Sequence, residues 1–308
     1  MSPPDRSWSR AGLGEAAHAA LASGLPASEV WSLLLGVLEE RARQRTPANL
    51  CQQWERDRFV QPSYIDQRTL NELEGHLLAA AEAFEAVELS PLAPLGVASA
   101  VALASQNKIV STVRGTEVVS DPTNVLALEC AKRLRADPKA HVRLATSHRC
   151  VRAQPFPKLP GYAAHFRLFC MVSAGRERES HGFTVDSLVE HIRAHLSALD
   201  RLEGHGYSFA DRKLKLLSVP RFASHAARIA AAFDDVPVVH ALLEQGYYDG
   251  LRFMISARAP AGQEIPLIDG GAFDWLRKLT SNHKMAFVGS AIGSQLAAYV
   301  FRSQPPGD

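Results

Sequence analysis

The apolar residues of the N-terminal region recur at helical spacing. Between residues 28 and 43, leucines and a valine stand beside glutamates and arginines, which is typical of an amphipathic helix. Pro26 precedes this run, and we expect Ser28 to be its N-cap. A second helix is predicted over residues 66–85, where the apolar positions share one face: Leu70, Leu73, Leu77, Leu78, Ala81 and Phe84.

The rest of the chain mixes short apolar runs with helical patterns. Runs of this length between polar turns are typical of strands. We predict strands over residues 87–91, 97–104, 109–113, 141–146, 166–172, 214–219, 251–257, 264–268 and 286–292. We predict helices over residues 124–134, 185–202, 226–233, 236–243 and 295–301. Several of the predicted strands follow one another as in hairpins, without the strict alternation of strand and helix. This order favours an α+β fold.

These patterns divide the chain into three predicted parts. Residues 1–58 form a helical N-terminal extension, residues 59–302 form the core domain, and residues 303–308 form a disordered tail. A chain of 308 residues with 46% hydrophobic content is long enough to bury a large core without disulfides or metals.

Charge and cysteine usage narrow the class of protein. The 34 basic and 32 acidic residues give a net charge of +2, so no global basic excess indicates nucleic acid or an anionic membrane as a partner. The uncharged run 89–105 is interrupted by Pro91 and Pro94 and is shorter than the roughly 20 residues of a membrane helix. The N-terminus lacks the apolar segment of a secretory signal. Four widely spaced cysteines favour a reduced, cytoplasmic protein: Cys51, Cys130, Cys150 and Cys170.

Two segments near the C-terminus are the most informative. Tyr247 and Tyr248 stand before Asp249-Gly250, and Gly270-Gly271 follow twenty residues on. Adjacent tyrosines on a strand would place one ring on each face, and one of them could donate a hydrogen bond into a pocket. Paired glycines let the backbone approach a ligand closely. The two segments resemble the signature segments of histidyl-tRNA synthetase, a class II aminoacyl-tRNA synthetase.

A third segment resembles motif 2 of the class II synthetases, which is two antiparallel strands joined by a loop. It runs from His148 through Arg149, Arg152 and Gln154 to the predicted strand near residue 166. The resemblance implies that Arg149 grips the α-phosphate and the carboxylate of an acyl-adenylate, for which the guanidinium fork is suited. The family's acceptors for adenine and histidine are replaced by apolar residues: Val151, Leu168 and Val172.

Asp121 and Thr123 precede the predicted helix 124–134. The resemblance implies that they hold the amino group of a substrate, and a carboxylate with a hydroxyl can satisfy an ammonium. The alternative is that both only cap the helix.

Other segments of the chain also resemble the family. Helix 66–85 with the strand after it resembles motif 1, which implies a homodimer. Residues 289–293 resemble the glycine-rich strand of motif 3, but the arginine for the γ-phosphate falls at Gln295 or Leu296. The signature arginine and tyrosine after the paired glycines are Ala272 and Phe273 here. Seven residues follow Phe301, so we expect no anticodon-binding domain, as in regulatory subunits of ATP phosphoribosyltransferase, which also resemble histidyl-tRNA synthetase cores.

The expected fold is therefore a class II synthetase-like antiparallel sheet flanked by helices. Two functions stay open. The first is a paralogue that does not charge tRNA and binds a small amino-acid-like or nucleotide ligand as an accessory or regulatory protein, with a protein partner. The second is a ligase that uses ATP with magnesium to activate a carboxylic or amino acid for a small acceptor or carrier protein. His191 and His195 have the spacing of a zinc pair, but an ordinary amphipathic helix explains them, and we expect no metal.

Overall fold

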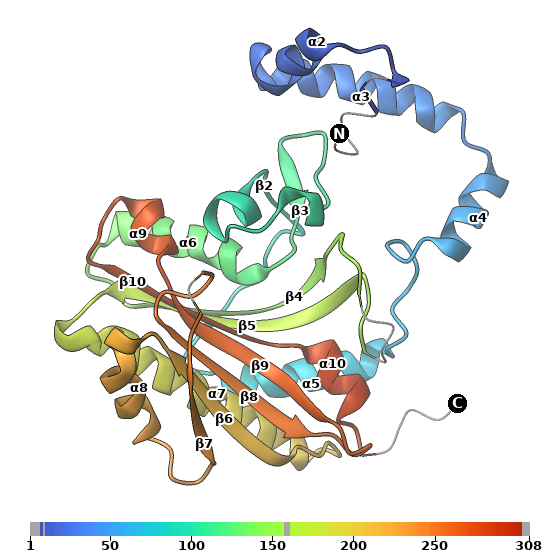
Figure 1. Cartoon of the computed structure of the whole chain (residues 1–308). Coiled ribbons are helices and arrows are strands. Elements are labelled where there is room, and N and C mark those ends of the chain that lie inside the picture. Colours follow the sequence, from blue (N-terminus) through green and yellow to red (C-terminus); the bar gives the residue numbers. More distant parts are fainter. Residues whose placement is uncertain (1–6, 9, 157–160, 245, 304–308) are drawn as a thin grey trace. The chain divides into compact units, whose positions relative to one another are not determined.

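The computed structural model describes residues 7–8, 10–156, 161–244 and 246–303 (Figure 1). Contacts divide the chain into two units: residues 1–61 with 111–116, and residues 62–110 with 117–308. Within the predicted tail, residues 304–308 lie outside the described residues.

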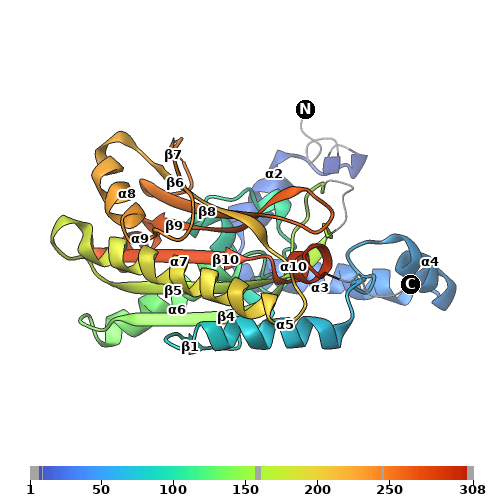
Figure 2. The ribbon, with the colours of Figure 1, turned by 90° about the horizontal axis from the view of Figure 1, so that it is seen from below.

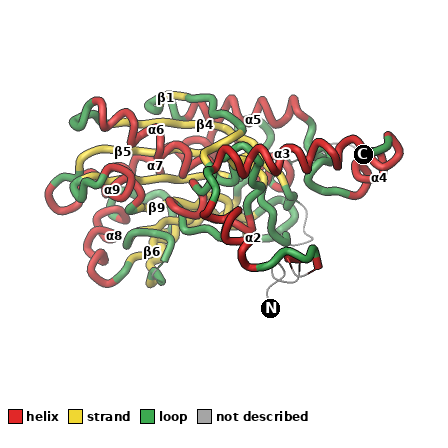
Figure 3. Tube along the Cα trace, turned by 90° about the horizontal axis from the view of Figure 1, so that it is seen from above, coloured by secondary structure: helices red, strands yellow, loops and turns green. Residues whose placement is uncertain are grey.

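The first unit is helical between residues 15 and 56. Its elements are α2 (Glu15–Ala19), a π-helical turn (Ala20–Gly24), α3 (Ala27–Arg43) and α4 (Pro47–Arg56). The long helix α3, labelled in Figure 3, begins directly after Pro26, so the prediction of Ser28 as its cap is wrong. Pro26 holds the N-cap position with an extended ψ of 141°, so Ser28 already lies inside the first turn. Thr46 and Asn49 form a reciprocal capping box on α4.

An eight-stranded sheet organises the second unit, in the order β1-β4-β5-β10-β9-β8-β6-β7. The neighbouring pairs are antiparallel except β1 with β4 and β6 with β7 at the two edges. The strands are β1 (Glu85–Ala86), β4 (Val142–Val151), β5 (His165–Arg176), β6 (Ala210–Ser218), β7 (Val238–Leu242), β8 (Leu251–Arg258), β9 (Glu264–Phe273) and β10 (Met285–Ile292). A small second sheet pairs β2 (Leu92–Pro94) with β3 (Thr116–Val118).

Helices cover both faces of the sheet (Figures 1 and 2). One face carries α5 (Gln67–Ala80), α7 (Gly182–Glu203), α8 (Ala223–Ala230) and α10 (Ser294–Val300). The other face carries α6 (Pro122–Ala136) and α9 (Trp275–Thr280). Short helical turns lie at Val97–Val101, Gln106–Lys108, Glu179–His181 and Pro220–Phe222. A sheet with helices on both faces confirms the predicted α+β class.

The alternation of side chains along β4 and β5 separates two cores. Phe169 and Met171 pack toward α5 and α7, whereas Cys170 and Val172 pack toward α6. Because directly opposed residues of an antiparallel pair share a face, this alternation also decides to which face each polar residue of the β4–β5 hairpin belongs.

The strongest helical patterns are confirmed. Asp66 caps α5 through its carboxylate, which accepts hydrogen bonds from the Arg68 and Thr69 backbone at 3.0 Å. Its predicted apolar face is buried, apart from the half-exposed Leu78. The helix ends at Ala80, five residues before the predicted end, and β1 occupies residues 85–86 where the strand was predicted over 87–91.

Three predicted elements are wrong. Residues 97–101 form a π-helical turn, because the buried carboxylate of Glu117 accepts hydrogen bonds from the backbone of Gly96 at 2.7 Å and Ala98 at 3.0 Å. Residues 109–113 form no strand. Residues 238–242 form β7 and not a helix, because parallel pairing with β6 outweighs the local pattern.

None of the helices in the described part of the chain has both the length and the apolar character that crossing a bilayer requires.

Candidate functional site

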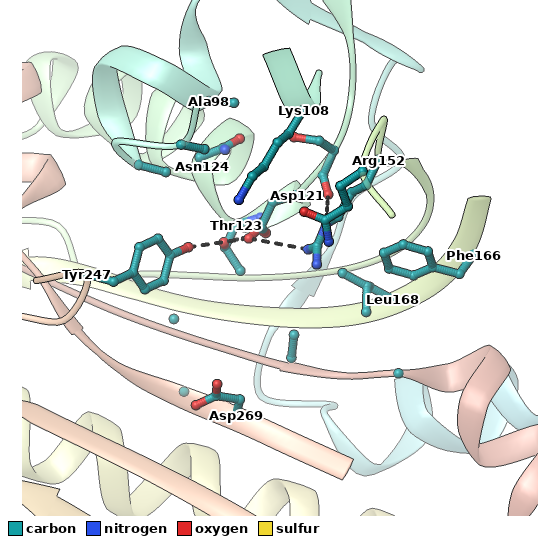
Figure 4. A pocket seen from close by; sticks show the side chains of 18 of the residues that line it. Ala98, Lys108, Asp121, Thr123, Asn124, Arg152, Phe166, Leu168, Tyr247 and Asp269 are labelled. Carbon is teal, nitrogen blue, oxygen red and sulfur yellow. Dashed lines mark hydrogen bonds and ion pairs between the residues drawn. The ribbon is translucent and has the colours of Figure 1, made fainter. Parts of the chain in front are cut away.

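A cavity of about 830 Å³ lies on the α6 side of the sheet (Figure 4). Its walls come from β5, β8, β9, β10, the start of α6, the turn near residue 105 and the tyrosine pair. Seven of the nine predicted site residues line it: Asp121, Thr123, Arg152, Gln154, Tyr247, Tyr248 and Gly270. The chain therefore gathers segments more than a hundred residues apart around one hollow.

One wall of the cavity is acidic. The Asp121 carboxylate accepts hydrogen bonds from the Thr123 backbone at 3.0 Å and hydroxyl at 2.6 Å, so Asp121 caps α6 and Thr123 lies in its first turn. Its second oxygen lies 3.4 Å from the Tyr247 hydroxyl, which donates to it (Figure 4). Burial and then Asp121 raise the pKa of Tyr247, so that hydroxyl stays protonated. Capping is confirmed for Asp121 and not for Thr123, and the Asp121 carboxylate also lines the cavity.

Cationic groups stand near this carboxylate. Arg152 donates from Nε to the Ser120 carbonyl at 2.9 Å and holds its guanidinium 5.0 Å above the Phe166 ring. One of its terminal nitrogens lies 3.9 Å from Asp121. Figure 4 shows the Lys108 side chain extending into the cavity. Among the described residues, its ammonium has no hydrogen-bond or ion-pair partner.

Sequence reasoning missed Lys108. The available signal was its position as the first charged residue after the uncharged run 89–107. That run places the lysine at the end of the turn Gln106–Lys108, and its backbone carbonyl accepts a hydrogen bond from the Ala153 backbone at 2.8 Å. The turn and the β4–β5 loop are thereby joined at the cavity mouth.

The tyrosine pair does not lie on a strand. Tyr247 and Tyr248 precede β8 in a bend, and their rings contact each other edge to face with centroids 5.0 Å apart. Both rings also contact Phe273. The expectation of one ring on each face of a strand is therefore wrong, because the pair precedes the extended backbone that begins at Leu251.

Tyr248 lies under an ion pair. Arg252 places its guanidinium 5.1 Å from the Tyr248 ring centroid and donates to both oxygens of Asp269, at 2.9 and 2.7 Å. Burial and then Asp269 raise the pKa of Tyr248. This ion pair is a second polar feature of the cavity that the sequence did not indicate.

The paired glycines serve packing within the protein. A Cβ at Gly271 would lie 2.5 Å from the Tyr248 ring, and one at Gly270 would lie 2.5 Å from the Ser290 Cβ. Gly270 lines the cavity, whereas Gly271 is covered by Tyr248 and does not. Glycine is therefore needed at these two positions because the Tyr248 ring and strand β10 pack directly against the backbone.

Arg149 lies on the other face of the sheet. Its guanidinium is 3.0 Å from His165 Nδ1 and donates to Gln295 Oε1 of α10 at 3.4 Å. The residue opposite it on β5 is Arg167, which donates to the buried Glu74 of α5. Arg149 does not line the cavity, so the expectation that it meets Tyr248 and the paired glycines there is wrong. The strand alternation gives the cavity position to Arg152.

His191 and His195 lie beneath the floor of the cavity, inside the α7 face. His191 Nδ1 and His195 Nε2 lie 2.8 and 2.9 Å from Ser290 Oγ. His191 Nε2 also lies 3.0 Å from Ser173 Oγ. These contacts make the pair part of a buried hydrogen-bonded cluster. Within the described residues, no group of three metal-ligating side chains comes together.

The acceptors that would read a nucleobase are replaced by apolar groups at the other end of the cavity. Leu168 lines the cavity in the position that the resemblance gives to one of these acceptors. Asp121 and Asp269 are the acidic side chains of the described lining, and both already accept hydrogen bonds from protein groups.

The comparisons identify the fold. No model of a known protein family and no curated protein sequence matches this chain. A crystal structure of an ATP phosphoribosyltransferase regulatory subunit/histidyl-tRNA synthetase from Bacillus halodurans C is similar, with a TM-score of 0.57 and 13% identity over 78% of this chain and 81% of that chain. A histidine–tRNA ligase subunit from Alicyclobacillus acidocaldarius has a TM-score of 0.57 and 15% identity over 83% of this chain and 96% of that chain.

Apo histidyl-tRNA synthetase from S. aureus is similar with a TM-score of 0.54 and 15% identity, over 75% of this chain and 64% of that chain. At these identities the likeness concerns the backbone. The eight-stranded sheet with helices on both faces agrees with it. The chain therefore has the class II aminoacyl-tRNA synthetase-like fold of histidyl-tRNA synthetase and the ATP phosphoribosyltransferase regulatory subunit.

Proposed function

We propose that this chain is a histidyl-tRNA synthetase-like paralogue that does not charge tRNA and binds a small amino-acid-like ligand in the cavity as an accessory or regulatory protein. The observation that carries the proposal is the placement of opposite charges within one hollow. Asp121 presents a carboxylate oxygen, and Lys108 and Arg152 present cations close to it. A ligand with an ammonium and an acidic group complements this arrangement.

The acidic wall suits an ammonium. Asp121 supplies a charged acceptor, and the Tyr247 hydroxyl lies 3.4 Å from it. A charge-assisted hydrogen bond contributes about 1.5–3 kcal/mol.

Lys108 suits the acidic group of the ligand, which is a carboxylate or a phosphate. Its ammonium is a mobile point charge with three donors and has no protein acceptor to give up within the described residues. A nucleotide meets the same cations through its phosphate, but the apolar Leu168 wall offers its base no acceptor.

The ligase alternative has weaker support. Arg152 and Gln154 line the cavity as that hypothesis requires, but Arg149, its phosphate-gripping residue, contacts α10. Phosphoryl and adenylyl chemistry depends on preorganised charge around the phosphates. Two of the expected charges are missing, because Arg149 faces away and Ala272 replaces the signature arginine.

A protein partner and a homodimer belong to the proposal. The name of the Bacillus halodurans protein includes a regulatory subunit, and a subunit acts together with another chain. The dimer would form through the motif 1 region, which is α5 and β1.

A thermal-shift screen tests the proposal. The twenty amino acids, AMP and ATP are each added to the wild-type protein, and ligands that raise the melting temperature are titrated by calorimetry. We expect at least one amino-acid-like compound to bind, with affinity about tenfold weaker in Asp121→Asn and in Lys108→Met. Arg68→Ala is the matched control, because its side chain is 96% exposed and lies outside the cavity lining.

Two results would contradict the proposal. One is the absence of a shift with every compound. The other is pyrophosphate exchange that depends on a carboxylic acid, which would establish the ligase alternative.

A further inference from the structure

A second hollow lies on the face of the sheet that α7 and α8 cover. Figure 2 shows these two helices beside the strands. We call this hollow the α7 groove. It has a volume of about 1040 Å³ and is lined by the residues before β4, the end of β5, the first turns of α7 and the end of α8. It shares no residue with the cavity of the proposed function.

The α7 groove is strongly cationic. Two carboxylates, Asp186 and Glu190, face six cationic side chains: Lys139, Arg143, Arg176, Arg178, Arg193 and Arg228. The whole chain carries a net charge of only +2, so this concentration is a local feature. His141 also lines the groove, and its pKa is lowered by burial and then by Arg143.

Both carboxylates are already paired. Arg143 donates to Glu190 at 2.7 Å, and Arg178 donates to Asp186 at 2.6 Å. Each carboxylate therefore neutralises one arginine. Neither is available to neutralise the other four cations of the groove.

The remaining four cations have no carboxylate partner in the described part of the chain. The side chains of Lys139 and Arg176 make no hydrogen bond or ion pair there. Arg228 donates to the Ser180 carbonyl at 2.7 Å, and Arg193 lies 5.9 Å from the Phe233 ring centroid. Neither contact neutralises a charge. Four like charges around one hollow repel one another unless an anion lies between them.

We propose that the α7 groove binds a small polyanion that carries two or more phosphate groups. Guanidinium groups match phosphate oxygens with two parallel hydrogen bonds, and several of them here converge on one hollow. Nucleic acid fits less well, because its binding sites have a basic stripe along the surface and a global basic excess, which a net charge of +2 does not provide. The proposal is independent of the ligand bound in the other cavity.

Inorganic tripolyphosphate is the probe. Its binding to the full-length protein is measured by calorimetry at low salt, with wild type, Arg176→Ala/Arg193→Ala, Arg152→Ala and Arg68→Ala. We expect the double variant to bind about a hundredfold more weakly, since it loses two charge-assisted contacts and each is worth about a factor of ten. Arg152→Ala, which tests the other cavity, and the surface control Arg68→Ala should bind as wild type does. Both mutated groove residues are exposed, so a circular dichroism melt should show the double variant folded.

Three outcomes would overturn the proposal. The double variant could bind tripolyphosphate as wild type does. Arg152→Ala could be the variant that loses binding, which would place the anion in the other cavity. A ten-nucleotide single-stranded RNA or a tetraglutamate peptide could bind more tightly than tripolyphosphate, which would make the groove a surface for a macromolecule.

Discussion

Arg149 and Arg152 stand three residues apart at the end of β4 and act on opposite faces of the sheet. Arg149 contacts Gln295 of α10, whereas Arg152 bonds the Ser120 carbonyl and stacks on Phe166 beside the cavity. Residues an odd number of positions apart on extended backbone point to opposite faces of a sheet. The arginine that serves the cavity is therefore Arg152.

Replacing each of these two arginines separately by alanine should show which one contributes to ligand binding. We expect Arg152→Ala to weaken binding of the amino-acid-like ligand about tenfold, because it removes a cation beside Asp121. Arg149→Ala should change that dissociation constant less than about twofold. Calorimetric titration of both variants checks this, and an equal loss in both would place Arg149 back at the ligand.

The buried Glu74 should be important for stability. Its carboxylate accepts hydrogen bonds from Arg167 at 3.0 and 2.5 Å and from the Ser294 hydroxyl at 3.0 Å. Glu74→Ala leaves a partly buried guanidinium without its partner, which costs about 3 kcal/mol of unfolding free energy. Urea denaturation measures the loss. Glu72→Ala, an exposed glutamate of the same helix, should change stability by less than about 0.5 kcal/mol. Similar losses in both variants would contradict the account of this network.

Replacing a strand glycine and a helix glycine by alanine should change the stability of the protein in opposite directions. Gly271→Ala places a methyl group against the Tyr248 ring and the Leu251 carbonyl, each 2.5 Å away, so we expect a loss of about 2 kcal/mol or more and a weaker ligand affinity. Gly75→Ala, inside α5, meets open space and should stabilise the protein by about 1 kcal/mol. Thermal melts of the two variants make the comparison, and stabilisation by Gly271→Ala would show that Tyr248 does not lie on this backbone.

Stability should decrease as the pH falls below about 6.5. Burial lowers the pKa of His195 to about 3 and that of His191 well below its ordinary value. An unfolded histidine has a pKa near 6.5, so between about pH 6.5 and 3 the unfolded chain binds more protons than the folded chain. The free energy of unfolding then falls by about 1.4 kcal/mol per pH unit for each histidine.

Urea denaturation between pH 7 and 5 should show this slope. In His195→Gln the slope should be smaller by about 1.4 kcal/mol per pH unit, which corresponds to one proton. In the exposed control His240→Gln the slope should be unchanged. An identical slope in wild type and His195→Gln would mean that this ring is protonated in the folded protein.

The sequence was informative where a local pattern decides the structure. Periodicity located α5, α6 and α7, and Asp66 and Asp121 cap their helices as residues of this type do at such positions. The motifs also brought Asp121, Arg152 and Tyr247 to one cavity. Each of these side chains lies at the end of an element whose position a short stretch of sequence determines.

Tertiary pairing decided what the sequence could not. The strand β7 exists because β6 pairs with it, and the turn at 97–101 exists because Glu117, about twenty residues on, binds its backbone. The face of Arg149 depends on the register of the β4–β5 hairpin, in which Arg149 lies opposite Arg167. Lys108 reaches the cavity from a turn, where the sequence has no periodicity to place it.

A crystal structure of the protein with the tightest-binding amino-acid-like compound of the screen tests the central claim most directly. We predict that the ligand's ammonium lies within hydrogen-bonding distance of the Asp121 carboxylate and that its acidic group meets Lys108 or Arg152. A ligand bound outside this cavity, or one whose acidic group points away from both cations, would contradict the account.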